Sequence, residues 1–340
     1  MTGQASPGAQ ADVTLITSTY ASSRHVDKFC ERAVSLFTSL AAEGVRGQLI
    51  VVANAPTPVE RRALSRLAQA ADFISGFSLR ILIVPRETLY ASWNRGLAAA
   101  DGQVLGFWNV DDWRNAAAIM EGLDLVNRGH RLIYFPWVEV EPSGWPLGAS
   151  VGSPRFPIVP EFDREAFVTA MNIGPFFLLD RGLVDLVGCF DSRFRIAGDF
   201  EWAIRAARAT DFVRGRSIGG VFLSTPAGLS GSGHPRHAAE RNVIRLRHCS
   251  GGDFEAASDA LMAEYLGPTE FEELQAQRRR QRSGMPSGHG DARFSDESWR
   301  RSQMWIRARR RALWLPRCVA GAVGLSSSFE RALSHLRRRR

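Results

Sequence analysis

The chain has 340 residues, of which 45% are hydrophobic, and its formal net charge is +8. This length and apolar fraction suit one large folded domain with an appendage. The sequence contains no G-x-x-x-x-G-K-[ST] loop and no G-x-G-x-x-G after its first apolar run, which argues against kinases and dinucleotide-dependent dehydrogenases. The four cysteines are far apart and lack metal spacing, which indicates free thiols in a reducing compartment, and the first ten residues do not predict a secretory signal.

The first part of the chain predicts an α/β sheet. A β-branched apolar run at residues 12–20 precedes a helical stretch at 25–42, and further strands are expected at 48–57 and 78–85. The strand at 48–57 has too few polar residues to face water and suits a parallel strand that is covered on both sides. Alternating strands and helices predict an open, mostly parallel twisted sheet with helices on both faces and a ligand site beyond the carboxyl ends of its strands.

A pair of carboxylates follows the next expected strand. Residues 89–102 predict an amphipathic helix that Gly102 ends in a left-handed conformation, and the apolar run 103–108 leads to Asp111 and Asp112. Hard cations such as Mg²⁺ take oxygen ligands from one or two carboxylates and from substrate phosphates. The pair therefore predicts a site for a divalent cation bound to a diphosphate. The alternative is that both Asp residues begin a helix at Trp113.

These segments resemble the family 2 glycosyltransferases of the GT-A fold, of the kind that builds bacterial cell-surface polysaccharides. Members often carry a segment S-x-N-x-G-x-x-x-A-x-G-x-x-(apolar)-(N/D)-x-D-D. The matching residues stand in the same order here, and they are Ser92, Asn94, Gly96, Ala100, Gly102, Asn109, Asp111 and Asp112. The resemblance covers roughly residues 13–246 and implies a GT-A domain at 1–250, with a nucleotide-sugar half at about 1–112 and an acceptor half at 113–250.

The resemblance also implies where the donor and the metal bind. A nucleoside-diphosphate sugar would contact the strand ends, and Mn²⁺ or Mg²⁺ would contact Asp112 and Asp111. The expected donor-binding residues are Thr17, Thr19, Tyr20, Asn54, Asn94, Arg95, Asn109 and Asp111. Tyr20 either stacks on the base or is an ordinary aromatic at a strand end. The chain departs from the family at Ala53, where many members have the Asp that reads the base, so UDP, dTDP and GDP sugars all stay open.

The second half contributes the expected general base. Residues 188–205 resemble the family stretch G-x-F-D-x-x-(F/Y)-x-x-x-x-D-x-(D/E)-(L/W)-x-x-R, whose second Asp corresponds to Asp199. In inverting members this carboxylate removes the proton of the acceptor hydroxyl. Asp199 also has the position of a helix cap, and the two roles are compatible. Glu201 and Trp202 are weaker candidates for acceptor binding.

The segments around this stretch complete the expected domain. A strand is expected at 131–140, a Gly-, Pro- and Ser-rich loop that shapes the acceptor pocket at 142–160, and an apolar core segment at 171–181. A further strand at 220–224 leads to a Gly- and Ser-rich loop with His234. This histidine either adds a metal ligand or is simply solvated.

The basic character of the chain is concentrated at its end. Residues 278–340 hold 17 Arg against 4 acidic residues, a charge of +13, whereas residues 1–277 carry −5. A helical segment is expected at 251–280, a linker at 281–297, and a basic amphipathic, membrane-associating tail at 298–340, in which residues 298–315 have the composition of an interfacial helix. Because each Arg near an anionic leaflet contributes roughly 1 kcal/mol, this tail predicts attachment to an anionic membrane surface. A solvated tail and nucleic-acid binding are the rival interpretations, and no nucleic-acid fold accompanies the Arg cluster.

These features predict a metal-dependent, inverting glycosyltransferase of the hexosyltransferase type. It would move a sugar from a nucleoside-diphosphate donor to a saccharide or lipid-linked acceptor in cell-surface glycan synthesis. It would be cytoplasmic, attached peripherally to the inner face of the cell membrane, with no nucleic-acid partner. The alternative is a catalytically silent member that binds a nucleotide sugar or a partner glycosyltransferase, which Ala53 and Asn109 keep open because they replace acids common in the family.

Overall fold

A single mixed sheet forms the centre of the molecule. The structure is a computed structural model, and it describes residues 11–140, 154–167, 173–224, 235–248, 272–273 and 275–276. The strands of the sheet are β1 (Val13–Thr19), β2 (Gly47–Asn54), β3 (Phe77–Val84), β4 (Val104–Phe107), β6 (Leu132–Tyr134), β8 (Phe177–Asp180) and β9 (Phe212–Arg214). Their order is β3-β2-β1-β4-β8-β6-β9. The first four are parallel, and β8 runs antiparallel to both β4 and β6.

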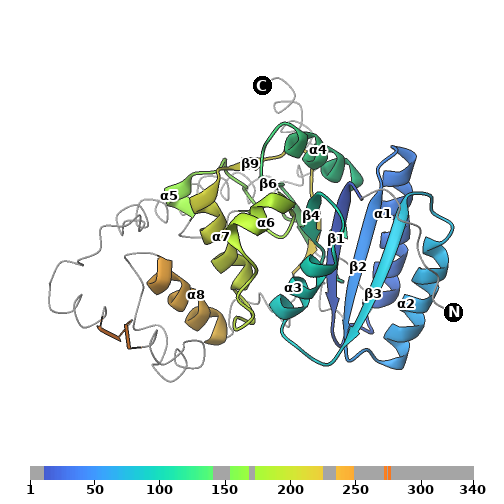
Figure 1. The fold of residues 1–340 in the computed structure, drawn as a ribbon, viewed down its shortest axis with the longest axis horizontal. Coiled ribbons are helices and arrows are strands. Elements are labelled where there is room, and N and C mark those ends of the chain that lie inside the picture. The colour runs from blue at the N-terminus through green and yellow to red at the C-terminus, as the bar shows by residue number, and fades with distance from the viewer. Residues whose placement is uncertain are drawn as a thin grey trace, which may run out of the picture.

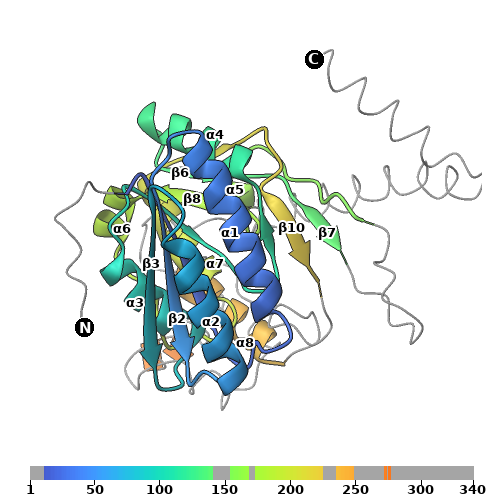
Figure 2. The same ribbon diagram turned by 90° about the vertical axis from the view of Figure 1, so that its right-hand side faces the viewer.

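Helices cover both faces of this sheet (Figure 1). One face packs against α1 (Val26–Ala42), α2 (Pro58–Ala71) and α4 (Ala116–Asn127), and Figure 2 shows α1 and α2 side by side in front of the strands. The other face packs against α3 (Leu89–Ala99), α6 (Arg181–Val187), α7 (Gly198–Ala209) and α8 (Pro235–His248), with the short α5 (Arg164–Phe167) beside them. All eight residues of β2 are buried, as expected of a strand covered on both sides. The predicted α/β fold with a largely parallel sheet is confirmed.

The strand expected at 131–140 is two strands in two different sheets. β6 belongs to the main sheet, whereas β7 (Val138–Val140) belongs to a three-stranded sheet of order β5-β10-β7, with β5 at Trp113–Arg114 and β10 at Gly220–Leu223. Pro136 lies between β6 and β7 and has no N–H to continue a ladder, which is why the run is interrupted.

Gly102 does not end α3 in the way that the sequence suggested. Its φ is not positive, and α3 ends at Ala100, which is extended at φ −74° and ψ 139°. The glycine is needed for space instead, because a Cβ at position 102 would lie 2.6 Å from both the backbone nitrogen and the Oγ1 of Thr14. The backbone N–H of Gly102 donates to that same Oγ1 at 2.9 Å, so the close approach is itself a bonded contact.

The alternative that Asp111 and Asp112 begin a helix is wrong. Residues 113 and 114 form β5, which pairs with β10, and α4 begins only at Ala116. The helix is capped by Asn115, whose side chain accepts a hydrogen bond from the backbone N–H of Ala117. The two carboxylates therefore need a different explanation.

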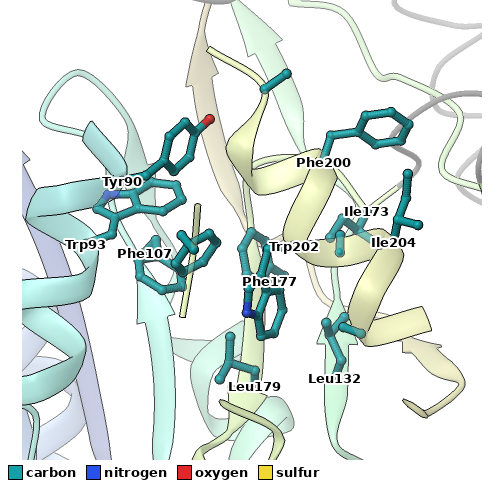
Figure 3. Packing of buried hydrophobic residues seen from close by; sticks show 14 of the residues in the cluster. Tyr90, Trp93, Phe107, Leu132, Ile173, Phe177, Leu179, Phe200, Trp202 and Ile204 are labelled. Atoms are coloured by element: carbon teal, nitrogen blue, oxygen red, sulfur yellow. The ribbon is translucent and has the colours of Figure 1, made fainter. Parts of the chain in front are cut away.

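One aromatic core joins the two halves of the chain. Figure 3 shows Tyr90 and Trp93 of α3 facing Phe107 of β4, with Trp202 of α7 beside them. The Trp93 and Phe107 rings stack at 4.3 Å between centroids, and Phe190 lies 5.1 Å from Phe107 and 5.3 Å from Trp202. Such buried rings contribute area and geometric specificity together. This core fixes α7 against α3.

The remaining expectations on organisation fall mostly outside the described residues. The helical segment at 251–280 is described only at 272–273 and 275–276, and the linker and basic tail lie beyond the described ranges. Within those ranges, no helix has the length and apolar character needed to cross a membrane.

Candidate active site

The carboxylate pair lies beyond the carboxyl end of β4, and its two members have different surroundings. Asp112 is only 1% exposed. Its Oδ1 accepts a hydrogen bond from the backbone N–H of Leu223 at 3.1 Å, and its Oδ2 accepts one from the side-chain amide of Asn109 at 3.0 Å. Asp111 is half-buried, and no hydrogen bond to its carboxylate is found among the described residues. Asp112 thus fastens β10 to this loop, and Asp111 is the more accessible carboxylate.

The positive charges near the pair bond to backbone oxygens. The guanidinium of Arg32 donates to the backbone oxygens of Asp111 at 2.9 Å and Asp112 at 3.1 Å. Burial, followed by the negative charge of Asp111, raises the pKa of Asp112 from 3.8 to about 7. Arg114 is buried nearby, and burial lowers its pKa to about 10. Its guanidinium donates hydrogen bonds to the backbone oxygens of Phe107 and Phe177 at the strand ends, and not to the carboxylate of Asp112. A buried carboxylate that lies beside a second carboxylate is stabilised by a bound cation, so the pair is suited to cation binding.

The donor set fits a divalent cation that arrives with phosphate. Mg²⁺ and Mn²⁺ prefer oxygen ligands, and one or two carboxylates suffice when a diphosphate supplies further oxygens. In the described ranges, no group of three or more His, Cys, Asp or Glu side chains could hold a metal alone. Asp111 is the accessible ligand in such a site, with Asp112 directly behind it. His234, the expected additional ligand, lies outside the described residues.

The residues at the end of β1 divide into buried and exposed positions. Thr17 and Thr19 are 0% exposed, and their hydroxyl oxygens have no hydrogen-bond partner in the part of the chain that the structure describes. Both side chains lie inside this edge of the sheet, and their contact with a donor stays a prediction. Tyr20 is 49% exposed, and the guanidinium of Arg86 lies over its ring at 4.6 Å. Tyr20 is the residue of this segment that is available for stacking on a base.

One buried carboxylate holds the loops that follow β1 and β2. Glu60 is 0% exposed and accepts hydrogen bonds from the backbone N–H groups of Ser22 and Thr57. Each of these loops begins with an alanine at positive φ, Ala21 at 49° and Ala55 at 41°. Left-handed non-glycine residues are costly and cluster at functional sites. Both loops lie at the carboxyl edge of the sheet.

The side-chain amide of Asn54 makes its hydrogen bonds within the protein. It is 1% exposed, its amide nitrogen donates to the hydroxyls of Ser92 at 2.8 Å and Ser18 at 3.1 Å, and its Oδ1 accepts from the backbone N–H of Glu87 at 3.1 Å. These contacts link the ends of β1 and β2 to α3. Asn54 therefore stabilises this edge from inside the protein, and its contact with the base stays a prediction.

Asn94 and Arg95 also make contacts within the protein. The amide nitrogen of Asn94 donates to the backbone oxygen of Phe190 at 2.8 Å, and the backbone N–H of Phe190 donates to Asn94 Oδ1 at 2.9 Å. This reciprocal pair of hydrogen bonds, the Asn94 clamp, joins the two segments that carry the family resemblance. Arg95 pairs with Glu87 at 2.8 Å on the surface.

Asp199 lies at the start of α7, against the start of α3. Its Oδ1 accepts hydrogen bonds from the Tyr90 hydroxyl at 3.1 Å and from the backbone N–H of Phe200 at 2.9 Å. Among the described residues Oδ2 has no hydrogen-bond partner. Burial raises the pKa of Asp199 above its ordinary value, against the bonds from Phe200 and Tyr90 and the charge of Arg241. The N-cap of the helix is Ala197, so Asp199 does not take the cap position.

The topology places Asp199 at the same edge as the carboxylate pair. α3 begins where the chain leaves the carboxyl end of β3, and Tyr90 is in its first turn. The pair follows the carboxyl end of β4, which is parallel to β1 and so to β3. The hydrogen bond from Tyr90 therefore brings Asp199 to the carboxyl edge, where open α/β sheets bind their ligands.

Glu201 and Trp202 face the interior, and their assignment to the acceptor stays a prediction. Glu201 is 4% exposed and pairs with Arg205 at 2.8 Å and His248 at 3.1 Å. Burial would raise its pKa, but the bonds from His248 and Arg205 hold it below its ordinary value. Trp202 is 0% exposed, and its Nε1–H donates to the backbone oxygen of Gly188 at 2.8 Å. Most of α7 is buried, so its polar residue Glu201 does not mark an exposed side of the helix.

Two residues beside Asp199 were not found from the sequence. Tyr90 is 1% exposed, and its only sequence signal is its place at the start of the helix that carries the S-x-N segment. Glu240 of α8 is 0% exposed and bonds to the backbone just before α7. No spacing rule connects a residue of α8 with the start of α7.

Comparisons with known proteins agree with the fold. No protein-family model matches the chain, and no curated protein matches it. Residues 1–349 of S. aureus TarS in complex with UDP-GlcNAc match at a TM-score of 0.53 and 13% identity, over 79% of this chain and 77% of that one. The TarS complex with UDP matches at 0.52 and 13%, over 80% and 78%. The mannosyltransferase PcManGT from Pyrobaculum calidifontis, in complex with GDP-Man and Mn²⁺, matches at a lower TM-score of 0.48 and 13% identity, over 94% of this chain and 85% of that one. The GT-A-like fold expected from the sequence is confirmed.

Proposed function

We propose that this chain is a glycosyltransferase that moves a sugar from a nucleoside-diphosphate donor to a saccharide or lipid-linked acceptor. The observation that carries the proposal is the hydrogen bond between Tyr90 and Asp199. It brings a half-buried carboxylate, whose Oδ2 has no hydrogen-bond partner among the described residues, to the edge of the sheet that also carries Asp111 and Asp112. TarS, which has the same fold, binds UDP-GlcNAc, and this supports a nucleotide-sugar donor.

Asp199 is the proposed general base. Its Oδ2 takes the proton of an acceptor hydroxyl, the hydroxyl oxygen forms a bond to the anomeric carbon, and the bond from that carbon to the diphosphate oxygen breaks. A single displacement of this kind inverts the anomeric centre. Because burial raises the pKa of Asp199, the carboxylate is a stronger base than an exposed aspartate. Tyr90 and the Phe200 N–H hold Oδ1, so they orient Oδ2 toward the acceptor.

Asp111 and Asp112 have different proposed tasks. When bound, Mn²⁺ or Mg²⁺ would neutralise the charge that develops on the departing diphosphate. Asp111 is the proposed direct ligand because it is the accessible carboxylate. Both carboxylate oxygens of Asp112 accept hydrogen bonds, from Leu223 and Asn109. Asp112 is therefore proposed to fix the shape of the loop and add negative charge to it without contacting the cation directly. In the donor site, Tyr20 is the proposed stacking residue for the base, and Arg95 is proposed to lie near the diphosphate.

The proposed setting of the reaction rests on the charge of the chain. The +13 charge of residues 278–340 supports a peripheral attachment to an anionic membrane surface on the cytoplasmic side. An acceptor carried on a lipid would then be delivered to the same surface. Cell-surface glycan synthesis is the proposed pathway class.

Thermal unfolding of the purified chain tests the donor site. UDP, dTDP, GDP and CDP are each added with and without Mn²⁺, because a ligand that binds only the native state raises the Tm. We expect a metal-dependent rise with one nucleotide, its loss in Asp111→Asn and its retention in Asp124→Asn. Asp124 is an exposed residue of α4 that pairs with Arg128, so it is a matched control. A metal effect that survives in Asp111→Asn would contradict the assignment of the ligand.

Turnover separates the proposal from its alternative. The sugar nucleotide whose base gives the rise in Tm is incubated with the chain, and release of the nucleoside diphosphate is followed. We expect slow release by the native chain and full donor binding without release in Asp199→Asn. Binding without release in the native chain would instead support a catalytically silent member, and no binding of any nucleotide would contradict both.

A further inference from the structure

Helix α8 contacts the backbone just before Asp199, the proposed base, through the buried side chain of Glu240. The carboxylate of Glu240 accepts hydrogen bonds from three successive backbone N–H groups, those of Arg195 at 2.8 Å, Ile196 at 2.8 Å and Ala197 at 2.7 Å. These residues lead directly into α7, and Asp199 follows two residues later. Glu240 is 0% exposed, so these bonds are shielded from water. One side chain of α8 therefore sets the backbone from which the base projects.

The next residue of α8 contributes a charge at the same place. The guanidinium of Arg241 lies over the ring of Phe200 at 4.9 Å, and Phe200 is adjacent to the base. The positive charge of Arg241 favours ionised Asp199, and the charge of Asp199 in turn opposes the effect of burial on the pKa of Arg241. Figure 1 shows α8 lying beside α7.

The opposite side of the same backbone is held by α3. The Tyr90 hydroxyl lies 2.7 Å from the backbone oxygen of Ile196 and 3.1 Å from Asp199 Oδ1. Gly198 permits this contact, because a Cβ at that position would lie 2.6 Å from Cδ2 of Tyr90. The backbone before the base is thus fixed by Tyr90 from one side and by Glu240 from the other.

We propose that α8 is part of the catalytic apparatus and that Glu240 and Arg241 are positioning residues for Asp199. Glu240 fixes the place of the base, and Arg241 keeps it ionised. This inference rests on the proposed function, because it concerns how that base works. It assigns a task to a helix that carries none of the segments on which the family resemblance was based.

The charges around Asp199 give the direction of each effect. The groups that act on it are the Tyr90 hydroxyl from α3, Arg241 from α8 and the backbone N–H groups of Phe200 and of Asp199 itself, whereas the carboxylate of Glu240 bonds to the backbone N–H of Ala197. Tyr90, Phe200 and Arg241 favour the ionised base, and burial opposes them. Removal of the Arg241 charge therefore leaves a larger fraction of Asp199 protonated at a given pH.

The pH profile of nucleoside-diphosphate release tests Arg241. In Arg241→Met the acid limb of kcat should move to higher pH by about one unit, with the KM for the sugar nucleotide unchanged. Arg241→Lys keeps the charge and should restore the native limb. The matched control is Arg247→Met, on the same helix, which removes the contact to Asp191 at 3.2 Å. An acid limb that stays in place in Arg241→Met, or moves equally in Arg247→Met, would overturn the electrostatic role.

A measurement without substrate tests Glu240. In Glu240→Gln one amide oxygen replaces two carboxylate oxygens, so the amide hydrogens of residues 195–197 should exchange with solvent at least tenfold faster, roughly the loss of one bond to a charged group. kcat should fall by about tenfold or more while donor KM is retained. Unchanged exchange would refute the clamp itself. Faster exchange with unchanged kcat would refute its task in positioning the base, and faster exchange in a chain that releases no nucleoside diphosphate at all would refute the proposed function instead.

Discussion

Asp112→Asn should remove a penalty that the folded protein carries at neutral pH. Asp112 is buried beside Asp111, and its pKa is raised from 3.8 to about 7 in the folded state. The substitution keeps the size of the side chain and its acceptor for the Leu223 N–H. The amide of Asn109 can turn to present its oxygen to the new amide group, so the hydrogen bonds can be kept.

The size of the effect follows from the shift in pKa. Between the two pKa values the folded state keeps the proton and the unfolded state has lost it, so the free energy of unfolding falls as pH rises. The slope is about 1.4 kcal/mol for each pH unit, which gives about 3 kcal/mol between about pH 5 and about pH 7. The variant has no titrating group at this position. Its stability relative to the native chain should therefore improve with pH over that interval and level off above about pH 7.

Urea unfolding of both chains in the presence of EDTA measures this difference. Titrating groups away from this loop act on both chains alike, so the change with pH in the difference between the two unfolding free energies reports Asp112 together with its coupling to Asp111. Addition of Mn²⁺ with the preferred nucleoside diphosphate should reduce the penalty in the native chain, since a bound cation stabilises the ionised pair. A difference that stays constant from about pH 5 to about pH 7 would show that Asp112 is not desolvated in the folded state, and the account of the carboxylate pair would be refuted.

Three other predictions concern packing, thiol chemistry and the charged tail. Gly102→Ala should lower the free energy of unfolding by about 1–3 kcal/mol in urea titrations, because its Cβ would meet the backbone of Thr14, and an unchanged midpoint would contradict this. Iodoacetamide followed by peptide mass spectrometry should modify exposed Cys189 and spare Cys30, whose pKa burial raises to about 12, and equal labelling in the native state would be the contrary result. Deletion of 278–340 should abolish binding to anionic vesicles at low salt, and unchanged sedimentation with vesicles would refute the assignment of the tail.

The parallel part of the sheet could be predicted because its strands have a clear local sequence pattern. A strand covered on both faces is an unbroken apolar run, and the polar residues that end such runs mark the carboxyl edge. The order of Asp111, Asp112 and Asp199 in the family segments then indicated where the candidate site lies. These predictions use only local patterns of residues.

The parts that were missed depend on contacts between distant segments. The sequence does not say whether Gly102 serves conformation or space, and the answer came from Thr14, which lies far along the chain. A polar residue at a strand end, such as Asn54, looks the same whether its amide faces a ligand or its own neighbours. Glu240 has no local pattern at all, because its three partners are backbone groups of another segment.

The Asn94 clamp limits how this chain can be recombined with a homologue. In a chimaera that takes its second half from a homologue, residue 112 would be an obvious crossover point. In this chain the crossover would part Asn94 from the Phe190 backbone and β4 from β8. Because Asn94, Tyr90 and Trp93 all lie on α3 and contact the second half, α3 and the second half should come from the same parent protein. A chimaera that moves residues 89–112 along with the second half keeps these contacts, and one cut at 112 loses them.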